Sequence, residues 1–276
     1  HIIEQTTSLR EHFSPQQEGE KKLRLSISSQ HYMFAVDALT DYLQSIIRNP
    51  RYTITFREGR TSQVIQDVIT QRSQVGIIFI SKMTQKFMER TLRKNGLEFT
   101  ELFSYPPYVF MNTAHPLSKY DALSIEQLAP YPYIQYTQEE DSYQFSEEII
   151  IPDINPERAI NITDRSTLFS IIASTDAYTI GTGILFRAWD YWPIVSIPMK
   201  NPLDIMRVGW IKSQTTTLSP TARNYIEQLK NTLISRGVTL SESALPKTDS
   251  ANTPDHGSDS LADTKEKRNS NSTELS

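Results

Sequence analysis

The chain has 276 residues, which is enough for one large domain or two small ones. It contains no cysteine, and this excludes disulfides, thiolate metal sites and a cysteine nucleophile. Its formal net charge of -4 at pH 7 argues against a chain that grips nucleic acid over a broad surface.

Apolar runs such as Gly76–Ile80 stop far short of the roughly 20 residues that cross a bilayer. The chain begins at His1, and neither a signal peptide nor a transit pattern follows. We therefore expect an internal fragment of a longer, cytoplasmic protein without membrane contact.

Strand and helix patterns alternate from about residue 20 onward. Residues 23–28 alternate apolar and polar side chains, which predicts a strand. Apolar residues then recur at helical spacing up to Asn49–Pro50, which ends the predicted helix. Ala35, Ala38 and Tyr42 widen the apolar stripe of this helix beyond a single buried face.

The next segments extend the same order. A strand is predicted over 52–56, a turn and helix over 59–71, and a strand buried on both faces over 75–80. A β-α-β-α-β order of this kind predicts a parallel sheet.

The second half is marked mainly by helix starts. Ser124 with Gln127 forms a capping box, Asp164 is the N-cap of a further helix, and Ser219 precedes the last helix. Gly237 marks the end of that last helix. Strands are predicted over 108–111, 133–136, 159–163, 178–181, 195–197 and 206–211.

Residues 241–276 differ from the rest in composition. They include eight serines and no aromatic residue, so they cannot bury enough apolar area to offset the entropy of ordering. We expect a disordered tail.

Motifs for catalysis or metal binding are not found. The acidic runs Glu139–Asp141 and Glu147–Glu148 are typical of a solvated face. No Gly-x-Ser-x-Gly elbow and no phosphate loop is present. The sequence predicts no catalytic residue, no metal, no cofactor and no enzymatic activity.

The order and spacing of several segments resemble the effector-binding region of LysR-type transcriptional regulators. The resemblance covers about residues 20–237. It is carried by residues 22–28, 54–59, 75–79, 114–118, 124–128, 171–174, 180–185 and 219–223. Gly76 stands where the family usually has aspartate.

This resemblance implies the α/β type 2 periplasmic-binding-protein fold: two Rossmann-like lobes with a ligand cleft between them. The chain would cross twice between lobes, near residues 101–105 and 203–206. The implied parts are a linker helix end and linker (1–19), lobe I (20–102 and 205–240), lobe II (103–204) and the tail (241–276).

The resemblance also implies a function. Such a domain senses a small-molecule effector and thereby modulates DNA binding and transcription by a winged helix-turn-helix, which this sequence lacks. The family pairs side by side through the first helix, so we expect a homodimer or tetramer with Ala35, Ala38 and Tyr42 near the contact.

Ligand residues are expected at the carboxyl ends of strands, where helix N-termini also point. Hydroxyls and an arginine there favour a small anion such as a carboxylate or an amino acid. The candidates are Ser28, Ser29, Gln30, Arg60, Thr61, Tyr136, Thr137, Thr182 and Gly183. The alternative is that Ser28 and Thr61 are plain N-caps and that Arg60 is solvated.

Two other function classes remain open at this stage. A solute-binding protein of a transporter has the same fold but requires export. An enzyme on the same fold would need a catalytic group in the cleft. The aromatic cluster of Trp189, Tyr191 and Trp192 indicates lobe packing more than a ligand cage.

Overall fold

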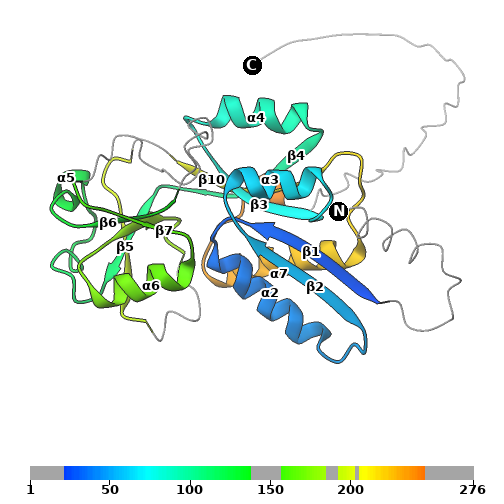
Figure 1. Cartoon of the computed structure of the whole chain (residues 1–276), viewed down its shortest axis with the longest axis horizontal. Helices are drawn as coiled ribbons and strands as arrows, with labels where there is room; N and C mark the ends of the chain where they lie inside the picture. Colours follow the sequence, from blue (N-terminus) through cyan, green and yellow to red (C-terminus); the bar gives the residue numbers. More distant parts are fainter. Residues whose placement is uncertain (1–21, 138–156, 185–191, 203–204, 246–276) are drawn as a thin grey trace, which may run out of the picture. The chain divides into compact units, whose positions relative to one another are not determined.

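Figure 1 shows the protein as a computed structural model, with strands and helices alternating along the chain. The structure describes residues 22–137, 157–184, 192–202 and 205–245. No helix within these ranges is long and apolar enough to cross a membrane.

The larger sheet has five strands in the order β2-β1-β3-β10-β4. β1 (Leu23–Ser29) lies in parallel between β2 (Tyr52–Glu58) and β3 (Val75–Ser81), which confirms the predicted parallel unit. β10 (Met206–Ser213) runs antiparallel to both β3 and β4 (Leu97–Tyr105). β10 therefore returns late in the sequence to complete a sheet that the first hundred residues begin.

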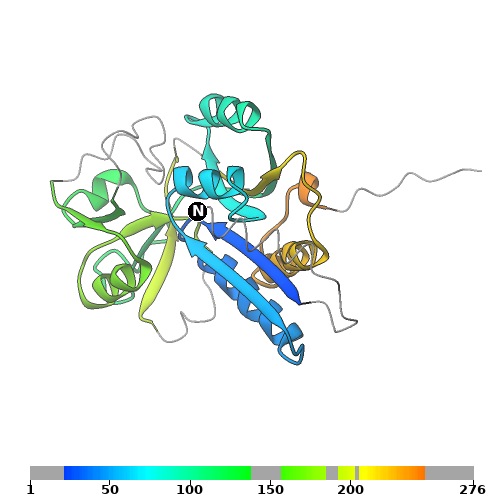
Figure 2. The same ribbon diagram turned by 45° about the vertical axis from the view of Figure 1, so that its right-hand side comes forward.

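Helices cover both faces of this sheet. α2 (Met33–Ile46) and α7 (Pro220–Ser235) pack together on one face, and α3 (Thr61–Ile69) and α4 (Gln85–Lys94) cover the other (Figure 1). The view in Figure 2 shows α2 beside the parallel pair β1 and β2. We call this sheet with its four helices the first lobe.

The packing of α2 gives an internal role to the three residues expected at a dimer contact. Ala35 and Ala38 are fully buried, and Tyr42 is 4% exposed. Tyr225 of α7 donates a hydrogen bond to the carbonyl of Ala35 at 3.0 Å and packs edge-on against Tyr42. The broad apolar stripe that motivated the dimer contact is thus accounted for within one chain, because α7 covers it.

Gly76 allows α3 to approach the sheet closely. A Cβ atom at this position would lie 2.8 Å from side-chain atoms of Val64 and Ile211. An aspartate side chain would not fit here unless α3 or β10 moved.

Among the described residues, the second lobe contains the remaining strands and two helices. β5 lies between β8 and β9, β6 pairs in parallel with β7, and a bridge between Tyr133 and Tyr178 connects the two groups. The elements are β5 (Tyr108–Asn112), α5 (Ile125–Leu128), β6 (Tyr133–Tyr136), β7 (Ala159–Ile162), α6 (Arg165–Ser174), β8 (Thr179–Gly181) and β9 (Ile194–Pro198).

The predicted helix starts are confirmed by their hydrogen bonds. The Asp164 carboxylate accepts from the Thr167 backbone N–H at 2.9 Å, and Ser219 Oγ accepts from that of Ala222 at 3.1 Å. Ser124 forms its capping box at α5. Gly237 has a φ of +78°, the left-handed conformation that commonly follows a helix end.

Two boundaries differ from expectation. The segment expected to cross between lobes at 101–105 lies inside β4, and the chain leaves the first lobe between Tyr105 and Tyr108. The tail was expected to begin at Ser241, yet the short helix η3 (Glu242–Ala244) packs on β4, with Ser241 and Ser243 bonded to Glu101. Expectations for 1–21 and 246–276 lie outside the described residues.

Candidate functional site

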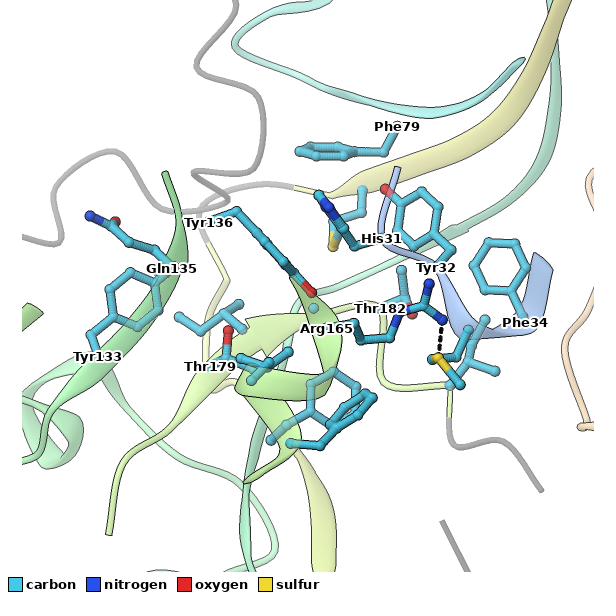
Figure 3. A pocket seen from close by; sticks show the side chains of 18 residues that line it. His31, Tyr32, Phe34, Phe79, Tyr133, Gln135, Tyr136, Arg165, Thr179 and Thr182 are labelled. Atoms are coloured by element: carbon cyan, nitrogen blue, oxygen red, sulfur yellow. Dashed lines mark hydrogen bonds between the residues drawn. The ribbon is translucent and has the colours of Figure 1, made fainter. Parts of the chain in front are cut away.

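A pocket of about 100 Å³ lies between the two lobes, where the carboxyl end of β1 and the start of α2 face β6, α6 and β8 (Figure 3). Both lobes contribute side chains to it. The lining residues are His31, Tyr32, Met33, Phe34, Phe79, Phe110, Tyr133, Gln135, Tyr136, Arg165, Leu168, Phe169, Thr179, Ile180, Gly181, Thr182, Ile184 and Met206. We call this the main pocket for its position between the lobes and not for its size; it is chiefly apolar and aromatic.

The wall from the first lobe is fixed by Gln30, which is fully buried. Its amide donates to Thr61 Oγ1 at 2.5 Å, and its carbonyl oxygen accepts from the Phe79 backbone N–H at 2.8 Å. The Tyr32 hydroxyl donates to the same oxygen at 3.1 Å. One amide therefore holds β1, β3 and α3 together and orients an aromatic residue of the pocket.

A ring stack bridges the lobes at one edge of the main pocket. The imidazole of His31 lies on the ring of Tyr136, with centroids 3.8 Å apart and planes 7° apart. On the other side of this ring stack lies a more polar pocket of about 180 Å³. This polar pocket is lined by His31, Glu58, Gly59, Arg60, Gln63, Tyr136, Thr137, Ile162 and Thr163.

Arg165 supplies positive charge to the main pocket. It is the first residue of α6, directly after the N-cap Asp164, and only 10% of its side chain is exposed. The guanidinium forms an ion pair with Glu58 of β2 and donates to the sulfur of Met33. Burial lowers the pKa of Arg165 to about 10, so the side chain still carries its charge near neutral pH.

The charge of Arg165 is only partly compensated. Its Nε atom is buried without a hydrogen-bond partner, and a thioether is a weak acceptor. Among the described residues that line the main pocket, Arg165 is the sole arginine or lysine. The arrangement can bind an anion whose apolar part contacts the aromatic walls.

Sequence reasoning missed Arg165, although the signal was present. It follows the carboxyl end of β7, the kind of position from which the other candidates were chosen. Arg60 was selected as the cation instead, and the structure places it in the polar pocket with Tyr136 and Thr137. Thr182 and Tyr136 line the main pocket.

The remaining candidates line neither the main pocket nor the polar pocket. Ser28 points toward α3, where its hydroxyl donates to Asp67 at 2.6 Å and lies 2.8 Å from Ser73 Oγ. Ser29 donates to the carbonyl of Gln30, and Thr61 accepts from the Gln30 amide. Neither Ser28 nor Thr61 is the N-cap of a helix, because Ser28 lies in β1 and Thr61 is the first residue of α3.

Gly183 follows the pocket residue Thr182 and adopts a φ of +79°. Its carbonyl accepts from Ser196 Oγ at 3.2 Å, and a Cβ atom here would lie 2.5 Å from the Tyr108 ring. Gly183 therefore lets the chain turn tightly beside the pocket.

Other chemical candidates do not assemble. In the part of the chain that the structure describes, no three His, Asp or Glu side chains gather as they would around a metal ion. His115 is buried away from the main pocket, where its Nδ1 accepts from the Leu117 N–H at 3.0 Å. Trp192 packs against Phe169, while Trp189, Tyr191 and both acidic runs lie outside the described residues.

Comparison with known proteins identifies the family. Residues 16–234 match the model of the LysR substrate binding domain. The chain belongs to the LysR substrate-binding-domain family. No curated protein matches the sequence.

Solved structures agree on the LysR fold. The effector-binding domain of QuiR in complex with shikimate has a TM-score of 0.53 and 14% identity, covering 76% of this chain and 97% of that chain. The regulatory domain of MetR from N. meningitidis has a TM-score of 0.55 and 14% identity, covering 79% and 98%. A full-length BenM mutant has a TM-score of 0.57 and 13% identity, covering 87% of this chain and 75% of that chain.

These findings confirm the predicted two-lobed fold and the LysR effector-binding role. The family match favours a regulator over a transporter's solute-binding protein. LysR domains of this kind regulate transcription and are in general not enzymes. They bind small-molecule effectors and act in oligomers that contact DNA through an N-terminal domain.

Proposed function

We propose that this LysR domain senses a small anionic molecule in the main pocket and thereby modulates DNA binding by the DNA-reading domain of its regulator. The observation that carries the proposal is the buried guanidinium of Arg165 among aromatic walls. A carboxylate is the simplest anion that matches the two parallel N–H donors of a guanidinium.

The size and lining of the main pocket further limit the class of molecule that can be the effector. With a cavity of about 100 Å³ and walls that include Phe79, Phe110 and Phe169, the pocket favours a small, flat body over a long or highly charged one. The QuiR effector-binding domain, which shares this fold, is in complex with shikimate, also a carboxylate. Cytoplasmic action as a transcription regulator is part of the same proposal.

Calorimetric titration with benzoate and its neutral isostere benzamide tests this function. We expect benzoate to bind and benzamide to bind at least about tenfold more weakly, because a charge-assisted contact is lost. Arg165→Gln should remove the preference for benzoate. Arg158→Gln, which removes an equal charge at an exposed position just before β7, is the matched control and should leave it intact.

A wider panel of small carboxylates, run by thermal shift, protects the test against a poor choice of probe. A ligand at 100 times its Kd adds about 2.7 kcal/mol of stability, which moves the melting temperature measurably. The proposal is overturned if no carboxylate stabilises the protein, or if Arg165→Gln responds to carboxylates as the wild type does.

We further propose that the domain forms a homodimer or tetramer through the surface of α2 and α7. Support comes from apolar side chains exposed at the ends of these helices: Ile47 is 67% exposed and Ile234 is 54% exposed. Sedimentation of the wild type and of Ile47→Glu tests this. A dimer that becomes a monomer in the variant supports the proposal, and a wild-type monomer at tens of micromolar contradicts it.

A further inference from the structure

We propose that Glu58 is a built-in competitor of the effector: it occupies Arg165 in the ligand-free protein, and the effector's carboxylate takes its place. This inference rests on the proposed function, since it names how the same pocket selects and responds to its ligand.

The positions of the two residues support an exchange. Glu58 is the last residue of β2 in the first lobe, and Arg165 is the first residue of α6 in the second. Their ion pair joins the two lobes beside the ring stack of His31 and Tyr136. Glu58 lines the polar pocket and Arg165 lines the main pocket, so the pair connects two adjacent cavities.

Burial is unequal across the pair, which decides which partner can leave. The Arg165 side chain is 10% exposed, whereas that of Glu58 is 31% exposed. A buried guanidinium without a carboxylate partner is costly, so Arg165 requires some anion at all times. Glu58 can regain water on leaving, and thus it is the exchangeable partner.

The backbone around Glu58 permits a side-chain movement without refolding. The next residue, Gly59, donates its N–H to the carbonyl of Ser29 at 3.0 Å, which fixes this end of β2 to β1. A released Glu58 carboxylate would remain within the polar pocket, whose lining includes Arg60. The exchange therefore alters one link between lobes while the first lobe keeps its structure.

Competition of this kind sets specificity. A neutral ligand gains nothing from Arg165 unless it breaks the ion pair, and an amide or ester cannot replace the lost charge. A carboxylate replaces Glu58 with an equivalent partner and adds the contacts of its apolar body. Affinity for carboxylates is consequently lower than the pocket alone would give.

Two substitutions of Glu58 test the competition by benzoate titration of the whole chain. Glu58→Gln removes the charge at nearly constant shape, and Glu58→Asp keeps the charge but withdraws it by one methylene. Both should tighten benzoate binding, Glu58→Gln by about tenfold, because the internal partner of Arg165 is lost or out of reach. Combined with Arg165→Gln, Glu58→Gln should produce no gain.

Glu98→Gln is the matched control. Glu98 also forms an ion pair, with Lys212 at 2.7 Å, but it lies on β4 and does not line the main pocket. It should leave benzoate affinity unchanged. Unchanged or weaker binding in Glu58→Gln overturns the competition. A gain in Glu58→Gln without one in Glu58→Asp also overturns it, because long-range charge alone would then explain the effect.

The outcomes separate this inference from the proposed function. If benzoate binds the wild type through Arg165 and Glu58→Gln makes no difference, the function stands and the competition is wrong. If benzoate binds both proteins through Arg165 and binds Glu58→Gln more tightly, both the function and the competition stand. If neither benzoate nor any carboxylate of the panel binds either protein, both proposals are wrong.

Discussion

The imidazole of His31 lies parallel to the ring of Tyr136, with ring centroids 3.8 Å apart. His31 follows β1 in the first lobe, and Tyr136 ends β6 in the second. One stacked pair therefore links the lobes and separates the aromatic main pocket from the polar pocket. A ligand in the main pocket has this stack as one wall.

Loss of the Tyr136 ring should weaken both the fold and the site. Aromatic pairs contribute about 0.5–1.5 kcal/mol beyond their buried area, so Tyr136→Leu should cost about 1 kcal/mol of unfolding free energy in urea. It should also weaken benzoate binding several-fold. Tyr136→Phe keeps the ring and is the control; a loss as large in this variant as in Tyr136→Leu would show that the stack contributes little.

Ser28→Ala should change stability and leave affinity unaltered. The Ser28 hydroxyl is buried and bonded to Asp67 and Ser73, and its removal leaves a buried carboxylate with one partner fewer. That should cost about 1–3 kcal/mol in urea unfolding. Ser26→Ala, two residues earlier on the same strand face, should cost less. Weaker benzoate binding with unchanged stability would instead place Ser28 in the ligand site.

Ser28 and Asp164 illustrate what the sequence could and could not predict. The alternating pattern of 23–28 and the N-cap Asp164 were sufficient to predict β1 and α6, because local periodicity and capping chemistry determine them. Whether Ser28 faces the cleft or α3 depends on strand register and on the packing of a distant helix. Likewise, α4 carries few apolar residues and was not predicted.

For the site as well, local patterns identified some residues, and long-range contacts could not be predicted. The rule that ligands bind at the carboxyl ends of strands identified Tyr136, Thr137 and Thr182 as candidates. In the structure Tyr136 and Thr182 line the main pocket, and Thr137 lines the polar pocket. The ion pair between Arg165 and Glu58 joins two residues that lie 107 positions apart in the sequence and belong to different lobes. No local pattern encodes such a contact.

Ala38→Glu should unfold the protein instead of separating a dimer. Ala38 is fully buried beneath α7, so a carboxylate there has neither water nor a partner. We expect a loss of about 3 kcal/mol or more in unfolding free energy. Thr40→Glu, at an exposed position of the same helix, should change it by less than about 0.5 kcal/mol. A stable, monomeric Ala38→Glu protein would contradict this packing.

His115 should make stability depend on pH. Burial lowers its pKa below the ordinary value of 6.5, and the charge of Asp176 opposes this only in part. Below pH 6.5 the unfolded chain therefore binds a proton that the native protein does not, so stability falls as the pH decreases through 6.5. Above that value the contribution is constant.

The variant His115→Asn isolates this effect, since its side-chain oxygen can still accept from the Leu117 N–H while no group titrates. Urea unfolding at pH 7.5 and pH 5.5 should show a smaller difference in the variant than in the wild type. An equal difference in both proteins would exclude His115 as the source.

A crystal structure of the chain grown with benzoate tests ligand recognition most directly. We predict the carboxylate within hydrogen-bond distance of the Arg165 guanidinium, the ring among Phe79, Phe110 and Phe169, and Glu58 turned into the polar pocket. Benzoate bound away from Arg165 would contradict this account of ligand recognition. So would an empty main pocket in crystals grown at a benzoate concentration that saturates the protein in solution.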